Sequence, residues 1–314
     1  METNLITHIY NEEYLLPFWL EHHKNMFDNI IVIDYRSTDK SVEICKTICP
    51  KCKVITTRNE FFDGIVIDSE VMDIENDLTG IKIALNTTEF LFYKTPIKEK
   101  FSNFNESTSL AIPSYAAHSS NKYEDIKDYK QYMNSLLNED VVYHLNKDRG
   151  LRQIHTFKNG NYTIGRHSTE NPSIPAEDIF IIWVGFFPLN DVTLKRKLQI
   201  KKNISEEDKR NGKGFQHFYD EERILNINKD NVDKGVPLKK THYELYKLVK
   251  EKIDSLEESF ELYCANDASI FVFLLCVFLI LLLICITDTM FMTITTKTFL
   301  MYIKKFKNLY NNYI

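Results

Sequence analysis

The first 90 residues alternate between short apolar runs and segments with helical patterning, and this alternation limits the possible folds more than any other sequence feature. Strands are expected over Leu5–Tyr10, Asn29–Asp34, Val54–Thr57 and Ile81–Leu85, and helices over Glu13–Met26, Ser41–Ile48 and within Gly64–Leu78. A continuous apolar run such as Asn29–Asp34 is typical of a parallel strand buried on both faces. The alternation therefore predicts an α/β fold with a doubly wound, mostly parallel sheet and helices on both faces.

Polar side chains gather where these expected strands end. They are Asn11 and Glu12, Asp34 through Asp39, Arg58 and Asn59, and Asn86 through Glu89. Ligands of doubly wound sheets bind beyond the carboxyl ends of the strands, so this edge is the predicted binding site. The sequence has neither G-x-G-x-x-G nor G-x-x-x-x-G-K-[ST], and only nine glycines, which argues against NAD-type dehydrogenases and P-loop kinases. A nucleotide would instead be held by carboxylates and amides, with a metal on its diphosphate.

Two N-terminal motifs and several later blocks resemble a known family. Asn11-Glu12 follows the first strand, and the second strand runs into the D-x-x-S-x-D loop Asp34-Tyr-Arg-Ser-Thr-Asp39. In this order they resemble the start of family-2-like glycosyltransferases with a GT-A fold. Further blocks look like a branch of bacteria and large DNA viruses, and they lie at 85–91, 159–167, 183–188, 196–199 and 212–217. The resemblance spans roughly residues 4–220.

The resemblance implies an enzyme, a glycosyltransferase that moves a sugar from a nucleotide-diphosphate donor to a glycan or other hydroxyl acceptor with inversion. In that chemistry a carboxylate takes the proton of the acceptor hydroxyl as its oxygen attacks the anomeric carbon. By position, Asn11, Glu12, Asp34 and Asp39 would line the nucleotide pocket, and Arg58 at the next strand end is assigned to the same pocket. Asp39 has a second interpretation, as a cap of the helix that follows it.

The expected metal motif departs from the family. Where GT-A enzymes usually carry Asp-x-Asp, this chain has Asn86-Thr87-Thr88 followed by Glu89. Neutral Asn and Thr oxygens are weaker ligands for Mn²⁺ or Mg²⁺ than carboxylates are. We therefore expect Glu89 or Asn86, together with His217, to hold the divalent cation weakly, and more tightly once the donor diphosphate is bound.

Two alternatives to this metal site stay open. His217 lies in a Gly-Lys-Gly loop, where a structural role fits it equally well. If no metal is held, cationic side chains such as Arg166 or Lys195 would neutralise the leaving diphosphate.

The second half of the sequence is expected to supply the acceptor side. Glu177-Asp178 precedes the apolar strand Ile179–Val184 and resembles the acidic pair from which family-2-like enzymes draw their base. Asp178 is therefore the predicted base, and the alternative is a solvated turn carboxylate. The basic runs Lys195–Lys197 and Lys201–Lys202 either meet the diphosphate or form a solvated helix face.

Two smaller groups of residues carry expectations about burial. His22 and His23 are expected on the surface of the first helix, and Cys45 and Cys49 on the inner face of the second. The spacing Cys45-x3-Cys49-x2-Cys52 lacks a fourth ligand for a tetrahedral zinc site, which argues against metal there.

The segment 268–287 has 20 residues without a charge, long enough at 1.5 Å per residue to cross a bilayer. We predict a transmembrane helix there, as a single-pass C-terminal anchor in the lipid bilayer. It would follow a GT-A-like domain over 1–240 and an amphipathic stalk over 241–267, and precede a basic tail over 288–314. The N-terminus lacks signal-peptide features, so the domain is expected to face the cytosol, whereas the lysines after the span argue for the opposite topology.

Charge and the altered metal motif leave two functional classes. A formal net charge of −5 argues against a nucleic-acid partner, which requires a basic surface. The first class is a membrane-anchored glycosyltransferase. The second is a catalytically inactive relative that binds a sugar nucleotide or a glycan, which the missing Asp-x-Asp allows.

Overall fold

The computed structural model describes residues 1–123, 126–146, 151–212, 214, 217–258 and 302–305. The chain divides into two compact units, Met1–Asp254 and Ser255–Ile314. All of the predicted site residues lie in the first unit.

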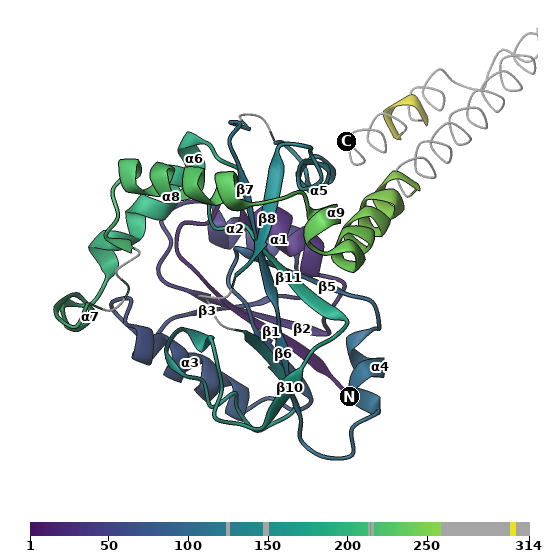
Figure 1. The fold of residues 1–314 in the computed structure, drawn as a ribbon. Helices are drawn as coiled ribbons and strands as arrows, with labels where there is room; N and C mark the ends of the chain where they lie inside the picture. Colours follow the sequence, from purple (N-terminus) through teal and green to yellow (C-terminus); the bar gives the residue numbers. More distant parts are fainter. Residues whose placement is uncertain (124–125, 147–150, 213, 215–216, 259–301, 306–314) are drawn as a thin grey trace, which may run out of the picture. The chain divides into compact units, whose positions relative to one another are not determined.

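The larger sheet of the first unit has seven strands in the order β10-β6-β9-β4-β1-β2-β3 (Figure 1). Its strands are β1 (Thr3–Ile9), β2 (Asn29–Asp34), β3 (Lys53–Thr56), β4 (Ile81–Ala84), β6 (Ser109–Ile112), β9 (Arg152–His155) and β10 (Ser173–Pro175). All pairings are parallel except those of β9, which is antiparallel to both β4 and β6. A mixed seven-stranded sheet flanked by helices fits a GT-A fold, as the sequence predicts.

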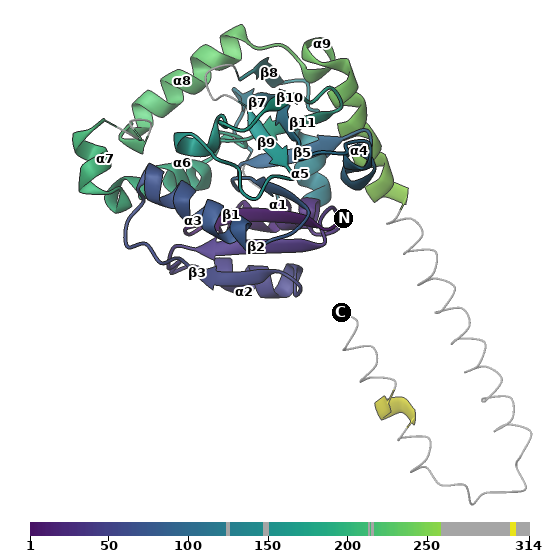
Figure 2. The ribbon, with the colours of Figure 1, turned by 90° about the horizontal axis from the view of Figure 1, so that it is seen from below.

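Helices cover both faces of this sheet (Figures 1 and 2). The helices of the first unit include α1 (Leu16–His23), α2 (Ser41–Ile48), α3 (Gly64–Asn76), α4 (Ile97–Ser102), α5 (Tyr129–Ser135), α6 (Asp191–Leu198), α7 (Glu206–Arg210), α8 (Glu221–Lys234) and α9 (Leu238–Thr241), with short 3-10 turns η2 (Ile164–Arg166) and η3 (Gln199–Asn203). Of these, α8 and α9 pack on the second sheet, described below. Val71 of α3 packs on Ile6, Ile31 and Ile33. Side chains alternate along a strand, so Ile30 and its neighbours two residues apart face the opposite side, where α1 and α2 lie.

A second sheet of four strands was not predicted from the sequence. It has the order β5-β11-β7-β8, with β5 (Glu89–Tyr93), β7 (Ser114–Ser119), β8 (Val141–Leu145) and β11 (Ile179–Trp183). The Trp19 indole N–H donates to the carbonyl of Glu89 at 2.9 Å, which ties α1 to the start of β5. The second sheet thus begins beside the end of β4, next to the predicted site.

The expectation that His22 and His23 lie on the surface is wrong. Both are buried, because α5 and β5 cover the face of α1 that points away from the large sheet. His22 Nδ1 lies 2.7 Å from the Tyr129 hydroxyl, and its Nε2 lies 2.7 Å from the Leu91 carbonyl. Burial lowers the pKa of His22 to about 3, so the ring is neutral at neutral pH.

The cysteine expectation is confirmed, with one addition. Cys45 and Cys49 are buried on the inner side of α2. Cys49 forms a disulfide with Cys52, which the sequence reasoning missed.

The predicted C-terminal membrane anchor and the membrane localisation are corrected here. Within the described part of the chain, no helix is both long and apolar enough to cross a bilayer. The segment 268–287 itself lies outside the described residues. A helix over 243–258 is described, and it buries Leu245, Val249 and Ile253, which lie four residues apart within the predicted amphipathic stalk.

Candidate functional site

The loops that follow β1 and β2 hold each other at the carboxyl edge of the large sheet. Asn11 Oδ1 accepts a hydrogen bond from the Thr38 N–H at 2.7 Å, and the Asn11 N–H donates to Ser37 Oγ at 3.0 Å. The Glu12 N–H donates to Ser41 Oγ at 2.8 Å. Asn11 adopts a φ of 51°, in the left-handed region that Asn tolerates better than most residues. The two loops therefore form one preorganised unit.

Asp34 and Asp39 are bonded within the same pair of loops. Asp39 Oδ1 accepts from the Ser41 N–H at 2.9 Å, and its Oδ2 accepts from the Glu13 N–H at 3.0 Å. Only Oδ1 of Asp39 thus bonds the start of α2, whose N-cap residue is Lys40, whereas Oδ2 bonds the loop before α1. Asp34 Oδ1 accepts from the Ser37 N–H at 3.0 Å, and its Oδ2 accepts no hydrogen bond from the described residues. One oxygen of Asp34 is therefore available to a ligand.

Helix α6 docks on the first of these loops. Arg196 Nε donates to Glu12 Oε2 at 2.5 Å, and both side chains are largely buried. Gln199, just after α6, donates to the Asn11 carbonyl at 3.0 Å. Glu12 is thus engaged in an ion pair that fixes α6 against the predicted nucleotide pocket.

A groove of about 540 Å³ runs along the other side of α6. It is lined by Asp191, Leu194, Lys195, Leu198, Gln199 and Glu221. Because Gln199 also bonds the Asn11 loop, the groove adjoins the predicted nucleotide pocket. Of the basic stretch, Lys195 lines this groove, whereas Lys197 is buried with its ammonium 5.5 Å from the centre of the Phe186 ring.

The loop after β3 is organised by the buried carboxylate of Glu70 on α3. Glu70 accepts hydrogen bonds from the Tyr35 and Thr57 hydroxyls, at 3.1 and 2.7 Å, and from the Arg58 N–H at 2.8 Å. The Arg58 side chain pairs with Asp73, and both are about half exposed. Arg58 therefore lies at the rim of the edge, with its guanidinium turned toward α3.

Glu89, a predicted metal ligand, is paired with an arginine. Arg152 on β9 donates from Nη2 to Glu89 Oε1 at 2.7 Å, and from Nε to the two carboxylate oxygens at 2.9 and 3.0 Å. The Asn86 N–H donates to Glu89 Oε2 at 2.8 Å. Both side chains of the pair are only 5% exposed. The Glu89 carboxylate is thus enclosed by donors.

Arg152 also fixes a turn that carries a second arginine. Its Nη1 donates to the carbonyls of Gly165 and Arg166, at 2.5 and 2.9 Å. Both residues of that turn have positive φ, 80° for Gly165 and 55° for Arg166. Asp68 on α3 completes the support, because its Oδ2 accepts from the Gly165 N–H at 2.6 Å. The turn is held in a conformation that non-glycine residues rarely adopt.

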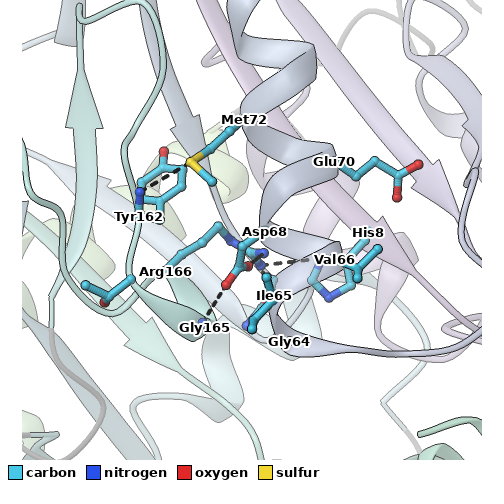
Figure 3. Close-up of polar contacts among 12 residues, drawn as sticks. His8, Gly64, Ile65, Val66, Asp68, Glu70, Met72, Tyr162, Gly165 and Arg166 are labelled. Carbon is cyan, nitrogen blue, oxygen red and sulfur yellow. Dashed lines mark hydrogen bonds and ion pairs between the residues drawn. The ribbon is translucent and has the colours of Figure 1, made fainter. Parts of the chain in front are cut away.

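The side chain of Arg166 lies beside Asp68 of α3 (Figure 3), and its Nη1 donates to Asp68 Oδ1 at 2.5 Å. Its Nη2 donates to Asn86 Oδ1, just after β4, at 2.9 Å. The same Nη2 lies 3.4 Å from His8 Nδ1 on β1. Arg166 is buried, and its Nε has no hydrogen-bond acceptor among the described residues. An orphaned buried donor of this kind is rare in folded proteins and calls for an explanation.

His8 lies beside Arg166, and two ion pairs are close to it, Arg166 with Asp68 and Arg152 with Glu89. Burial lowers the pKa of His8 well below its usual value, and Arg166, Arg152 and His217 each lower it further. His8 is therefore neutral, in agreement with its Nδ1 accepting from Arg166. His217 is close enough to His8 to lower its pKa, and the role of His217 as a metal ligand stays a prediction.

The residues predicted to hold a divalent cation do not fit that task. Asn86 Oδ1 accepts from Arg166, and the Glu89 carboxylate accepts from Arg152 and from the Asn86 N–H. A cation bound there would lie beside two guanidinium groups. No group of three or more His, Cys, Asp or Glu side chains that could hold a metal occurs in the described part of the chain. We therefore derive no chemical step through a metal.

Asp178 lies away from the carboxyl edge. It immediately precedes β11, whose far end, Trp183, is the residue that pairs with Glu89. Lys100 forms an ion pair with Asp178 at 2.7 Å. Burial raises the pKa of Asp178, but hydrogen bonds from Lys100 and Thr95 outweigh it and leave the pKa lowered. A lowered pKa weakens a general base, so neither position nor electrostatics supports the assignment of Asp178.

The sequence reasoning missed Arg152, Asp68 and His8. Each contacts a predicted site residue or the Arg166 turn, but the partners are far apart in the chain: Glu89 and Arg152 are separated by 63 residues, and Asp68 and Arg166 by 98. No local motif marks such pairs. The one available signal was Arg152 itself, a charged residue beside the apolar Ile154 in a short strand.

Comparison with known proteins gives structural likeness only. No protein-family model and no curated protein sequence matches the chain. Among solved structures, residues 1–349 of S. aureus TarS in complex with UDP-GlcNAc share 11% identity at a TM-score of 0.39, over 65% of this chain and 66% of that one. TarS 1–349 without a named ligand shares 14% identity at a TM-score of 0.37, over 65% of each chain. This chain thus spans just under two thirds of those fragments.

A second similar structure is glucosyl-3-phosphoglycerate synthase from Mycobacterium tuberculosis, in complex with Mn²⁺, UDP and glucosyl-3-phosphoglycerate. It shares 14% identity at a TM-score of 0.24, over 28% of this chain and 34% of that one. The TM-scores of all these structures lie below 0.5.

Proposed function

We propose that this chain is a glycosyltransferase that takes a sugar from a nucleotide-diphosphate donor and transfers it to a hydroxyl acceptor with inversion. One observation carries the proposal: a single sheet edge joins the Asn11–Asp34 loop pair with the cationic cluster around Arg166. The first part offers a carboxylate oxygen to a base or a ribose. The second offers the guanidinium donors of Arg166 to a diphosphate. This is the polarity that a nucleotide-diphosphate sugar requires.

The donor-side residues divide into contacts and supports. Asp34 Oδ2 is the proposed acceptor for an N–H of the base or a hydroxyl of the ribose. Asn11, Glu12 and Asp39 are proposed to position that contact, because their side chains are bonded within the loops or to α6. Arg58 is paired with Asp73, so it could contact the donor only after that ion pair is broken.

The groove along α6 is the proposed acceptor site. It adjoins the nucleotide pocket, and two carboxylates line it, Asp191 and Glu221. In the proposed reaction one of these takes the proton of the acceptor hydroxyl, whose oxygen forms the new bond to the anomeric carbon. The bond from that carbon to the diphosphate breaks, and the diphosphate leaves with its electron pair.

Donor binding is the first test. A thermal-shift panel of UDP-, GDP-, CDP- and ADP-sugars should show stabilisation by at least one of them, since a ligand that binds the native state stabilises it by mass action. Asp34→Ala should then weaken that binding at least about tenfold, which corresponds to the loss of about 1.4 kcal/mol. Asp28→Ala is the matched control, because Asp28 immediately precedes the other end of β2 and pairs with Lys98 there. Equal affinity in the Asp34 and Asp28 variants would remove Asp34 from the pocket.

The alternative is a catalytically inactive protein that binds a sugar nucleotide or glycan. It is favoured by the Asn86-Thr87-Thr88 sequence, which lacks the usual paired carboxylates. Release of nucleoside diphosphate from the bound donor, followed with Mn²⁺ and with excess EDTA, separates the two. Release in either condition supports the transferase, whereas donor binding without release in the presence of a range of sugar and polyol acceptors supports the alternative.

A further inference from the structure

The position that a divalent cation would need is surrounded by arginine side chains in this chain. Asn86 is the first residue of the altered motif, and its side-chain oxygen accepts from Arg166 rather than facing open solvent. Glu89, the only carboxylate in the motif, is enclosed by Arg152 and the Asn86 N–H. The motif thus serves as an acceptor for guanidinium groups.

Arg166 has the features of a ligand-binding cation rather than of a purely structural one. It pairs with one carboxylate, Asp68, while its other two hydrogen-bond partners, Asn86 and His8, are neutral. Its Nε donor lacks an acceptor among the described residues, although the residue is only 3% exposed. Asn86 and Gly165 beside it are only partly buried, so the cluster reaches the surface at this point.

Arg152 and Lys195 are weaker candidates for the same role. All three side-chain nitrogens of Arg152 already donate to Glu89 or to backbone carbonyls. Lys195 lines the α6 groove, on the side proposed for the acceptor. A guanidinium also suits phosphate oxygens better than an ammonium does, because its planar donors match two oxygens at once.

We propose that Arg166 takes the place of the divalent cation, so that this chain binds the donor diphosphate through the Arg166 guanidinium and without a metal ion. Arg152 acts as a positioning residue, because it holds the Gly165–Arg166 turn that presents this side chain. The inference rests on the proposed function, since it names how the same site binds its donor.

The test compares one nucleoside diphosphate with its parent nucleoside. UDP, GDP, CDP and ADP are screened, and the tightest binder is titrated by calorimetry in excess EDTA and again in excess MnCl₂. We expect affinities within about twofold of each other in the two conditions, and much weaker binding of the nucleoside. Arg166→Met should weaken the diphosphate at least about tenfold while changing the affinity of the nucleoside little. Lys98→Met is the control, because it removes one positive charge from the Asp28 pair that precedes β2.

A double variant is the control for misfolding of the Arg166 variant. Arg166→Met leaves Asp68 buried without its partner, so Asp68→Asn/Arg166→Met removes both charges together. Binding that depends on Mn²⁺, or diphosphate affinity unchanged in the folded double variant, would overturn the Arg166 proposal and leave the transferase proposal standing. Failure of every nucleotide to bind in either condition would overturn both.

Discussion

Replacement of Arg152 by methionine is the most direct perturbation of the network that carries the site. The change keeps an unbranched side chain of similar length and removes the guanidinium. It leaves the Glu89 carboxylate, which is 5% exposed, without its charged partner. It also removes the donor that the Gly165 and Arg166 carbonyls share.

The expected loss of stability follows from that geometry. Breaking a buried ion pair by removal of one partner costs about 3–5 kcal/mol, because a buried charge is left uncompensated. Glu89→Gln in addition removes that charge and keeps an oxygen for the Asn86 N–H. The double variant should then lose only about 1–3 kcal/mol, from the two backbone carbonyls that lack a donor. The double variant should therefore be more stable than Arg152→Met alone by about 2 kcal/mol.

Urea denaturation of the wild type, the two single variants and the double variant measures these values as a cycle. Glu206→Gln is the control, because it breaks an exposed pair with Lys209 and should change stability by less than about 0.5 kcal/mol. The reasoning fails if Arg152→Met costs less than about 1 kcal/mol, or if the losses of the two single variants simply add in the double variant.

Three further predictions concern other parts of the first unit. Burial lowers the pKa of His118 to about 4, below its value near 6.5 in the unfolded chain. As the pH is lowered, the unfolded state therefore binds more protons at this residue than the native state does. On account of His118, the free energy of unfolding should fall by about 1.4 kcal/mol for each unit by which the pH is lowered between about pH 6.5 and 4. His118→Gln should reduce the measured slope by that amount, and an unchanged slope would show that His118 is not buried as a neutral ring. Gly80→Ala should lower the free energy of unfolding, measured by chemical denaturation, by more than about 2 kcal/mol, because φ is 86° and a Cβ would lie 2.3 Å from the Glu2 carbonyl oxygen. Gly212→Ala should lower it by only about 1 kcal/mol, because φ is 64° there but a Cβ would meet nothing within 4 Å. Similar losses at the two glycines would remove the clash as the cause. Asp178→Asn should change the rate of nucleoside-diphosphate release by less than about threefold, whereas a loss of about a hundredfold or more would restore Asp178 as the base.

The sequence predicted those strands and helices that are marked by a local apolar run or by capping residues. The structure begins and ends β2 and α2 at the predicted residues, because an apolar run followed by Ser37-Thr38-Asp39 marks both in the sequence. The second sheet could not be predicted, because not all of its strands have such a local pattern. β7 reads Ser-Tyr-Ala-Ala-His-Ser, which has little apolar character, and it is buried because β8 and β11 pair on its two sides and α8 packs against it.

The candidate site shows the same division. Asn11 and Asp34 could be placed because strand ends are readable from the sequence and meet at one sheet edge. Glu89 was identified as a residue of the site, but its expected role changed, because its partner Arg152 comes from a strand of the other sheet. Arg166 was named only as an alternative, since nothing near it in the sequence indicates its contacts with Asp68 and Asn86.

The ion pairs of the site also have a consequence for the order in which the chain folds. They join residues 63, 98 and 184 positions apart: Glu89 to Arg152, Asp68 to Arg166, and Glu12 to Arg196. Contacts between distant parts of a chain form slowly, because a long loop must close before the contact gains any energy. The strands β1 to β4 can pair through nearby segments, but the binding edge is complete only after β9, the Arg166 turn and α6 have docked. During refolding, nucleotide binding should therefore appear after most of the secondary structure has formed.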